Sequence, residues 1–274
     1  MWDRGLPEIM YGTAWKEEDT ARLVALAVAR GFLALDTANQ PKHYREALVG
    51  QALKVLAQKG IERQRLFIQT KFTPIGGQGA RVPYDPEAAL ATQVSQSFES
   101  SLRHLQTDYL DSWLLHGPNA RFGLGRSDWE IWRSMEEIHR SGRVGRIGIS
   151  NVSLEQIQAL SEGAEIKPAI VQNRCYAVRG WDREVRQFCR DRNIVYQGFS
   201  LLTANPGVLR SGLVAALAQR FDKTPAQIVF RFAQQIGILP LSGTTSERHM
   251  REDLEVGSFS LSREALDKIE TLEG

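Results

Sequence analysis

The sequence contains little cysteine and none of the residue spacings that hold a structural metal. Cys175 and Cys189 are the two cysteines among 274 residues, and neither belongs to a CxxC or Cys/His pattern. A disulfide framework and a zinc site are therefore not expected. We interpret the two isolated thiols as typical of a reducing, cytoplasmic environment, and we expect no metal.

The sequence also lacks a charge excess and a long hydrophobic run. Its 34 basic and 32 acidic residues leave a net charge of +2, which is too small to indicate nucleic acid or an anionic membrane as a partner. No stretch approaches the ~20 consecutive apolar residues of a membrane span. The first seven residues lack the apolar core of a secretory signal. We expect a globular protein that binds neither nucleic acid nor a membrane.

Short apolar runs alternate with longer amphipathic segments along the chain. Strands are expected at residues 9–11, 32–35, 66–70, 110–115, 147–149, 169–171, 194–199 and 238–241, and helices at 20–30, 44–58, 86–105, 129–141, 154–161, 183–192 and 224–235. This alternation is typical of repeated βα units in an α/β protein. Eight such strands predict a (β/α)8 TIM barrel, with a doubly wound open sheet as the alternative. The lack of a GxGxxG motif after the first strand disfavours the open sheet.

Two further C-terminal helices are expected after the last strand, at residues 247–255 and 263–272. No linker, repeat or charge block divides the chain, so we expect one domain over residues 1–274. Three of the helices begin with capping signals, which are Ser153 with Gln156, Asp85 before Pro86, and Thr224 before Pro225. The glycine-containing stretches 72–84 and 117–128 follow strands, and in a barrel they would overhang the active-site end as substrate loops.

Four titratable side chains are expected to meet at the carboxyl ends of the strands. Asp36, Lys71 and His116 each end an apolar run, and Tyr44 opens the segment after Asp36. A lysine beside a tyrosine lowers the phenol pKa from about 10, and an aspartate keeps the lysine charged. With the histidine as a further hydrogen-bonding group, these residues would protonate a carbonyl oxygen while a hydride reaches its carbon.

The chain resembles the aldo-keto reductase family over nearly its whole length. The motifs that carry the resemblance are GTAW at 12–15, LDTA at 35–38, TK at 70–71, LQTDYLDSWLLH at 105–116, GRIGISN at 145–151, VQN at 171–173 and PAQ at 225–227. The family's catalytic tetrad falls on Asp36, Tyr44, Lys71 and His116. The resemblance implies an oxidoreductase that reduces aldehydes or ketones to alcohols by hydride transfer from NADPH, bound without a Rossmann domain. Tyr44 is the implied proton donor.

The resemblance also implies a cofactor site. Ser150, Asn151 and Gln172 would hold the nicotinamide carboxamide, because hydroxyl and amide groups match its donors and its acceptor. Phe199 would stack on the nicotinamide ring. The other implied cofactor-binding residues are Thr13, Ser200, Leu202, Ser242, Gly243, Thr244, Arg248, Glu252 and Asp253.

Two departures from the family pattern concern the proton donor and the stacking ring. Tyr44 lies farther from Asp36 than is usual, so that His43 competes with it as the working residue. We favour Tyr44, because it directly precedes the segment that leads into the next helix. Phe199 stands where tyrosine is common, which keeps the stacking and removes the hydroxyl.

A third departure concerns the cofactor phosphate. Leu241 stands where a lysine is expected near the 2′-phosphate. The cation is then sought among Arg248, His249 and Arg251, and Arg248 is favoured. Ser242, Gly243 and Thr244 form a turn suited to an anion. NADPH is favoured on this pattern, and NADH stays open.

Aromatic residues predict an apolar substrate pocket. Its expected lining consists of Trp15, Phe72, Phe122, Trp129 and Trp181, which favours small-molecule carbonyl substrates with a hydrophobic part. The sequence contains no coiled coil, so a monomer or weak oligomer is expected. The physiological substrate is left open.

Two other functions compete with carbonyl reduction. The first is a non-catalytic sensor or regulatory subunit that binds the nicotinamide cofactor, although the chain retains all four tetrad residues. The second is a barrel lyase or isomerase with Lys71 as a Schiff-base nucleophile. That chemistry requires a lysine that is not paired with a carboxylate, so Asp36 argues against it.

Overall fold

The computed structural model describes residues 6–272 and contains a closed barrel of eight parallel strands in chain order, with β1 pairing β8. The strands are β1 Met10–Gly12, β2 Ala34–Asp36, β3 Phe67–Phe72, β4 Ser112–Leu115, β5 Ile147–Ser150, β6 Ile170–Arg174, β7 Val195–Phe199 and β8 Leu239–Ser242. The predicted (β/α)8 barrel is therefore confirmed, and the open-sheet alternative is wrong. Residues 1–5, which belong to the segment searched for a secretory signal, lie outside the described residues.

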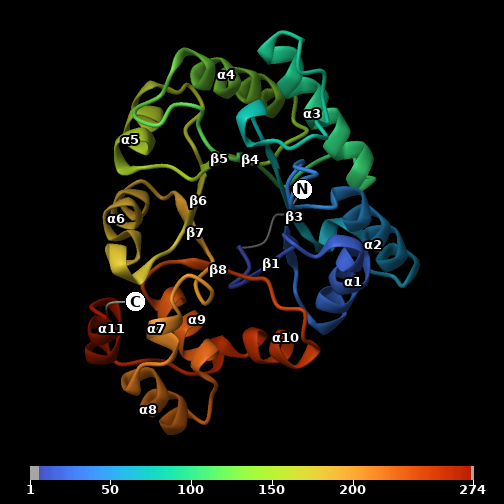
Figure 1. Cartoon of the computed structure of the whole chain (residues 1–274). Coiled ribbons are helices and arrows are strands. Elements are labelled where there is room, and N and C mark those ends of the chain that lie inside the picture. Colours follow the sequence, from blue (N-terminus) through green and yellow to red (C-terminus); the bar gives the residue numbers. More distant parts are fainter. Residues whose placement is uncertain (1–5, 273–274) are drawn as a thin grey trace.

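Helices surround the barrel on its outer side (Figure 1). They are α1 Thr20–Arg30, α2 Glu46–Gln58, α3 Leu90–Leu105, α4 Arg126–Arg140, α5 Leu154–Gly163, α6 Arg183–Asp191, α7 Pro206–Leu209, α8 Gly212–Phe221, α9 Pro225–Gln235, α10 Glu247–Leu254 and α11 Arg263–Glu270. Short 3-10 helices lie at Glu17–Asp19, Arg63–Arg65, Ile75–Gly77, Ala177–Asp182 and Val256–Ser258. The two C-terminal helices, α10 and α11, are confirmed.

The helix boundaries follow the capping signals in two of three cases. Ser153 and Thr224 each accept a hydrogen bond from a backbone N–H in the first turn, at the starts of α5 and α9. The signal at Asp85 is wrong as a helix start, because α3 begins at Leu90. The Asp85 carboxylate instead accepts the backbone N–H of Glu87, which closes a turn.

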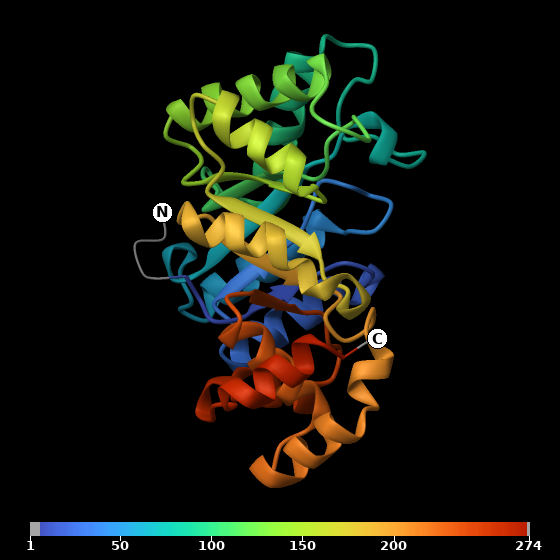
Figure 2. The same cartoon turned by 90° about the vertical axis from the view of Figure 1, so that its left-hand side faces the viewer.

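Two helices between β7 and β8 were not predicted. The four-residue α7 and the ten-residue α8 precede α9, and α8 lies at the outer edge of the molecule (Figure 2). A helix as short as α7 spans about one turn, so its sequence cannot show a helical period.

Side chains along each strand alternate between the barrel interior and the surrounding helices. Met10, Ala34, Phe67, Leu114, Ile170 and Leu241 form the apolar cluster inside the barrel. In β3, Ile68 and Phe72 belong instead to the outer core between strands and helices. This alternation places Lys71 inside the barrel, close to its carboxyl end.

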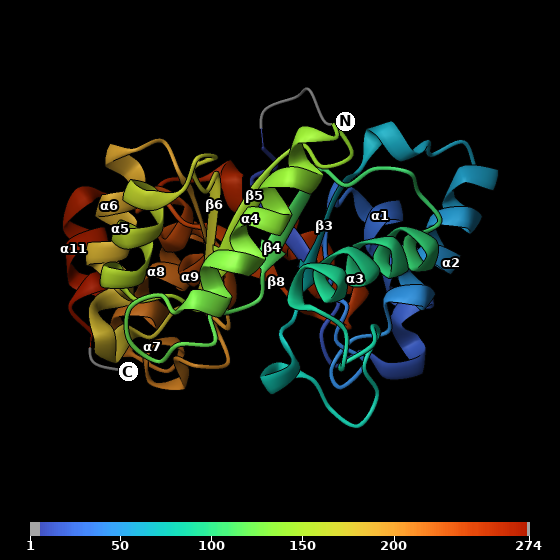
Figure 3. The same cartoon turned by 90° about the horizontal axis from the view of Figure 1, so that it is seen from above.

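Two loops extend from the carboxyl ends of β3 and β4 (Figure 3). In the first, Tyr84 Oη donates to Thr73 O at 2.8 Å. In the second, the carbonyls of Ala120 and Gly123 accept hydrogen bonds from Gln156 Nε2, both at 2.9 Å. The first loop is therefore closed by one of its own side chains, and the second is anchored by a side chain of α5. Between residues 6 and 272, no helix has the length and apolar character needed to cross a membrane.

Candidate active site

A cavity of about 1090 Å³ lies at the carboxyl ends of the strands. Its lining includes three of the four tetrad residues, Asp36, Tyr44 and His116. The expected cofactor residues in its lining are Ser150, Gln172, Phe199, Ser200, Leu202, Ser242, Gly243, Thr244, Arg248, Glu252 and Asp253. The fold thus brings together residues that are more than 200 positions apart in the chain.

Lys71 is fully buried and is held by β2. Its Nζ donates to Asp36 Oδ1 at 2.7 Å, to Asp36 Oδ2 at 2.8 Å and to Thr37 O at 2.8 Å. Burial lowers the pKa of Lys71, and the Asp36 carboxylate opposes that change. Because an ammonium group has three protons, these contacts use all of them.

Tyr44 lies just before α2, between the lysine and the histidine. Its ring centre is 5.5 Å from Lys71 Nζ and 6.0 Å from the ring centre of His116. Burial, followed by the Asp36 carboxylate, raises the pKa of Tyr44 well above its usual value. The expected net fall of this pKa is therefore wrong, because burial disfavours the phenolate. Tyr44 keeps its proton at neutral pH.

His116 follows β4 and is held at its backbone and at its ring. Its N–H donates to Phe72 O at 2.8 Å, and Nδ1 lies 2.7 Å from Thr73 Oγ1. Burial, with the Lys71 charge second, lowers the pKa of His116 to about 3. The ring is therefore neutral at neutral pH. If the Thr73 hydroxyl donates to Nδ1, then Nε2 carries the remaining ring proton.

His43 also lines the cavity but is held differently from Tyr44. Its ring packs against Trp15 with centres 4.0 Å apart, and its Nδ1 lies 2.9 Å from Gln40 Oε1. Burial, and then the Lys42 charge, lower its pKa. His43 thus belongs to the Trp15 side of the cavity.

Residues at the ends of β5 and β6 are linked by hydrogen bonds. Ser150 Oγ donates to Gln172 O at 2.6 Å. Asn151 Nδ2 donates to His116 O at 2.7 Å and to Ser150 Oγ at 3.1 Å. Asn151 has a φ of 56°, a left-handed conformation that asparagine tolerates better than most residues. Ser150 and Gln172 line the cavity, whereas Asn151 supports the backbone beside it.

The segment after β7 continues the cavity wall. Phe199 ends the strand with a half-buried ring, and Ser200 follows with a φ of 57°. Leu202 lines the same wall. A non-glycine residue in this conformation is uncommon and typical of segments constrained by a functional site.

The turn after β8 is fixed by buried groups. Ser242 Oγ donates to Asp253 Oδ2 at 2.5 Å. Burial raises the pKa of Asp253 to about 6, although the Ser242 hydrogen bond opposes this. Lys16 Nζ donates to Gly243 O, and Thr244 O accepts the Tyr11 hydroxyl at 2.9 Å. The turn is therefore held from both β1 and α10.

Three basic residues of α10 differ in their relation to the cavity. Arg248 and His249 line it, and the Arg248 side chain is 75% exposed. Arg248 Nε lies 3.6 Å from Glu252 Oε1. Arg251 pairs with Glu247 on the same helix and does not line the cavity. Of the three candidates, Arg248 and His249 are thus placed toward this space.

Several expected site residues lie elsewhere. Thr13 is buried, and its Oγ1 donates to Asp36 O at 3.0 Å, so it supports β2 from outside the cavity. Of the aromatic residues, Trp15 lines the cavity, whereas Phe72, Phe122, Trp129 and Trp181 do not. Strand alternation turns Phe72 into the outer core, where Trp181 and Trp129 also pack, and Phe122 is 76% exposed.

Two further residues that line the cavity, Lys16 and Arg174, were not predicted from the sequence. Arg174 is two residues after Gln172 on β6. Because side chains two positions apart on a strand face the same side, this spacing predicts that Arg174 lies at the mouth of the cavity. Lys16 is buried, and burial lowers its pKa. Its position depends on the contact with Gly243, which the local sequence does not reveal.

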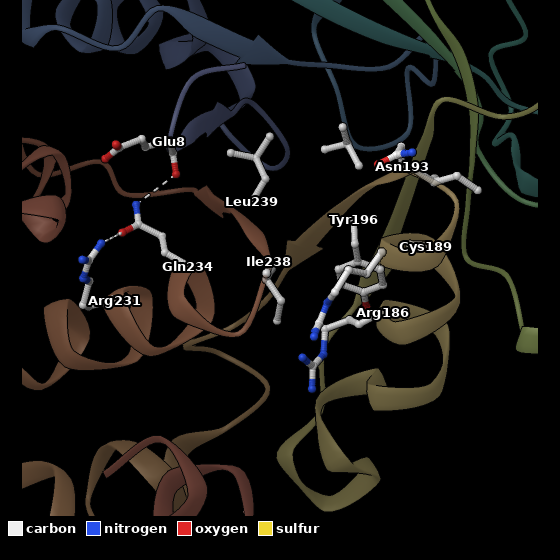
Figure 4. A pocket seen from close by; sticks show the side chains of 13 residues that line it. Glu8, Arg186, Cys189, Asn193, Tyr196, Arg231, Gln234, Ile238 and Leu239 are labelled. Atoms are coloured by element: carbon white, nitrogen blue, oxygen red, sulfur yellow. Dashed lines mark hydrogen bonds between the residues drawn. The ribbon is translucent and has the colours of Figure 1, made fainter. Parts of the chain in front are cut away.

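A second, shallower depression lies near the amino ends of β7 and β8 (Figure 4). Its volume is about 620 Å³. Arg186 is already bonded to Trp181 O, Ile236 O and Glu270, and Gln234 links Arg231 to Glu8 O. These charged groups of the second depression are thus engaged in hydrogen bonds within the fold. Within residues 6–272, no group of three His, Cys, Asp or Glu side chains is placed to hold a metal ion.

The sequence and the fold match known proteins along almost the whole chain. The model of the Aldo/keto reductase family matches residues 8–273. The chain is 29% identical over 250 residues to glyoxal reductase of Bacillus subtilis (strain 168), covering 91% of this chain and 82% of that protein. It is 29% identical over 275 residues to methylglyoxal reductase of Yersinia pestis, covering 98% and 90%. An aldo-keto reductase crystallised with NADPH has the same fold, with a TM-score of 0.82 at 22% identity over 98% of this chain and 85% of that one.

Proposed function

The chain belongs to the aldo/keto reductase family and is therefore an oxidoreductase, and we propose that it reduces small aldehydes or ketones to alcohols with NADPH. One observation carries the proposal. Tyr44, His116 and the Asp36–Lys71 pair meet at one cavity whose wall also contains Ser150, Gln172 and Phe199. A neutral acid, a neutral hydrogen-bond donor and a wall that combines a planar ring with polar side chains thus adjoin the same space.

The cavity wall fits a nicotinamide dinucleotide. Phe199 provides a planar ring, and Ser150 and Gln172 provide polar groups at neighbouring strand ends. Gln172 Oε1 has no hydrogen-bond partner among residues 6–272, so it is free to accept one from a carboxamide. When bound, NADPH supplies the hydride for the carbonyl carbon.

We assign proton donation to Tyr44. Its raised pKa keeps it protonated, so it can hydrogen-bond a carbonyl oxygen and release its proton as negative charge develops there. A His116 Nε2–H group would donate to the same oxygen and stabilise that charge. The Asp36–Lys71 pair places a positive charge 5.5 Å from the Tyr44 ring and thereby limits the effect of the carboxylate.

We assign the 2′-phosphate of NADPH to Arg248. This guanidinium is exposed at the cavity wall. Its Nε lies 3.6 Å from Glu252 Oε1 and its Nη2 lies 3.1 Å from His249 Nε2, so its remaining N–H groups can bind a phosphate. Ser242, Gly243 and Thr244 would adjoin the same end of the cofactor. Leu241 lines the cavity without adding a charge, so selection of NADPH over NADH would rest mainly on Arg248.

The substrate class is proposed from the relatives and the cavity. Two of the relatives are named for glyoxal and methylglyoxal, which are small carbonyl compounds. Trp15 contributes aromatic surface next to His43. We propose small aldehydes and ketones as substrates, in the cytoplasm, for a monomer or weak oligomer. The buried free thiols of Cys175 and Cys189 agree with a reducing compartment.

The test is the loss of NADPH absorbance at 340 nm with a panel of small aldehydes and ketones. Turnover of at least one of them with NADPH is expected. NADPH binding without turnover of any carbonyl would favour the non-catalytic sensor. Borohydride trapping of a substrate on Lys71 would favour the Schiff-base lyase or isomerase.

A further inference from the structure

The barrel interior contains a layer of glutamine side chains. Gln69 on β3 and Gln197 on β7 are fully buried, and Gln172 on β6 is 3% exposed. On each of these strands, the residue two positions before the glutamine either belongs to the apolar cluster inside the barrel or packs against that cluster. The glutamines therefore lie one layer closer to the carboxyl ends of the strands than those residues. Barrel interiors are usually filled by branched apolar residues, and buried amides are costly unless hydrogen-bonded.

Gln69 and Gln197 form a reciprocal amide pair across the barrel. Gln69 Nε2 donates to Gln197 Oε1 at 2.8 Å, and Gln197 Nε2 donates to Gln69 Oε1 at 3.0 Å. The second hydrogen of Gln69 Nε2 goes to Asp36 Oδ1 at 2.7 Å. The pair thus connects β3 with β7 and reaches a tetrad residue.

The same pair determines how the Gln172 amide is turned. Gln172 Nε2 donates to Asp36 Oδ1 at 3.0 Å and to Gln197 Oε1 at 2.9 Å. Both amide hydrogens are therefore used inside the barrel. If the amide were turned over, its oxygen would face two acceptors with no hydrogen between them. The bonds leave Oε1 as the free end of a side chain that lines the cavity.

Resting on the proposed function, we propose that Gln69 and Gln197 are positioning residues for the cofactor and the tetrad. Their amide pair keeps the Gln172 oxygen turned toward the cavity, where it can accept the carboxamide NH₂ of the nicotinamide. It also holds Asp36, whose Oδ1 accepts from Lys71, Gln69 and Gln172. Neither Gln69 nor Gln197 lines the cavity, so both act through other residues.

The first test is Gln197→Met, which keeps the side-chain length and removes the acceptor of Gln172 Nε2. Affinities for NADP⁺ and for its 3-acetylpyridine analogue are measured by quenching of tryptophan fluorescence. The analogue has a methyl group in place of the carboxamide NH₂, so it cannot donate to Gln172 Oε1. The wild type should prefer NADP⁺. In Gln197→Met this preference should fall about fivefold, the size of one net hydrogen bond.

The second test is Gln69→Met, which removes a donor to Asp36 Oδ1 and the partner of the Gln197 amide. Without this partner the Gln197 amide is no longer held against Gln172, so the preference for NADP⁺ over the 3-acetylpyridine analogue should fall in this variant as well. A loss of packing alone would weaken both cofactors equally. An unchanged preference would overturn the role assigned to Gln69.

The matched control is Ser112→Ala. Ser112 pairs with Gln69 in the β3–β4 register and is fully buried, and its hydroxyl has no partner among the described residues. This variant perturbs the same layer and should keep the cofactor preference. Equal weakening of both cofactors in Gln197→Met, at unchanged preference, would overturn the proposal. A wild-type chain that binds neither cofactor would instead contradict the proposed function.

Discussion

Lys71 Nζ lies 2.7 Å from Asp36 Oδ1, with 0% and 4% of the two side chains exposed. Removing one partner of such a pair leaves an uncompensated buried charge, which costs more than the pair contributes to stability. The pair is also adjacent to Tyr44, whose pKa is raised by burial and then by the Asp36 carboxylate. Stability and reactivity are thus coupled at these two residues.

Lys71→Met should therefore lose nearly all activity and also lower the melting temperature. Without the lysine, the Asp36 carboxylate acts alone on Tyr44 and raises its pKa further. The double variant Asp36→Asn with Lys71→Met removes both charges, so it should melt at a higher temperature than the single variant. Thermal unfolding and kcat/KM across pH measure both effects. A wild-type pH profile in Lys71→Met would contradict the coupling.

Tyr44→Phe should abolish carbonyl reduction while NADPH affinity changes little. The hydroxyl acts on the reacting oxygen, and the ring that packs near His116 is retained. Steady-state rates and fluorescence titration separate the two effects. His43→Ala is the control and should keep substantial turnover. If His43→Ala were inactive and Tyr44→Phe active, the proton donor would be His43.

Arg248→Ala should weaken NADPH binding by about tenfold and leave NADH nearly unchanged. A charged hydrogen bond to phosphate is worth roughly 1.5–3 kcal/mol, and NADH lacks the phosphate. Leu241→Lys should increase the preference for NADPH, because it adds a positive charge beside Ser242. Arg251→Ala is the matched control, since Arg251 pairs with Glu247 outside the cavity. Equal weakening of both cofactors by Arg248→Ala would show that Arg248 does not contact the phosphate.

Asp253 should make stability fall as pH rises from about 4 to above 6. Its pKa is raised to about 6 in the folded chain, whereas an aspartate in the unfolded chain titrates near 3.9. The folded state therefore binds more protons in this window, and that stability is lost as pH rises through the folded pKa. Between pH 4 and pH 7, the free energy of unfolding of Asp253→Asn should increase by about 1–3 kcal/mol relative to that of the wild type. Urea unfolding at both pH values measures the difference, and a pH-independent difference would contradict it.

Gly50→Ala should destabilise the fold by several degrees in melting temperature. A Cβ atom at Gly50 would lie 1.9 Å from His104 O, so α2 and α3 would have to separate. Overpacking of this kind typically costs about 1–3 kcal/mol. The control is Gly212→Ala in α8, where a Cβ atom meets nothing within 4 Å. Equal melting temperatures for both variants would contradict the close approach.

The order of strands and helices is predictable from the sequence because it follows from local hydrophobic periods. The expected helix at 20–30 matches α1, and the Ser153 and Thr224 caps start α5 and α9. At two places the local sequence signals did not predict the observed structure. Asp85 caps a turn rather than a helix, and α7 is too short to show a period.

The sequence by itself determined that Asp36 and Lys71 lie close to the carboxyl ends of strands, and in a parallel barrel such ends must converge. Only the tertiary structure decided the direction of the Tyr44 pKa shift, because burial is a property of the whole packing. It alone brought Lys16 onto Gly243 O. It also joined Gln69 to Gln197 across 128 positions of the chain. Contacts between distant residues depend on register and closure of the sheet, which no local pattern encodes.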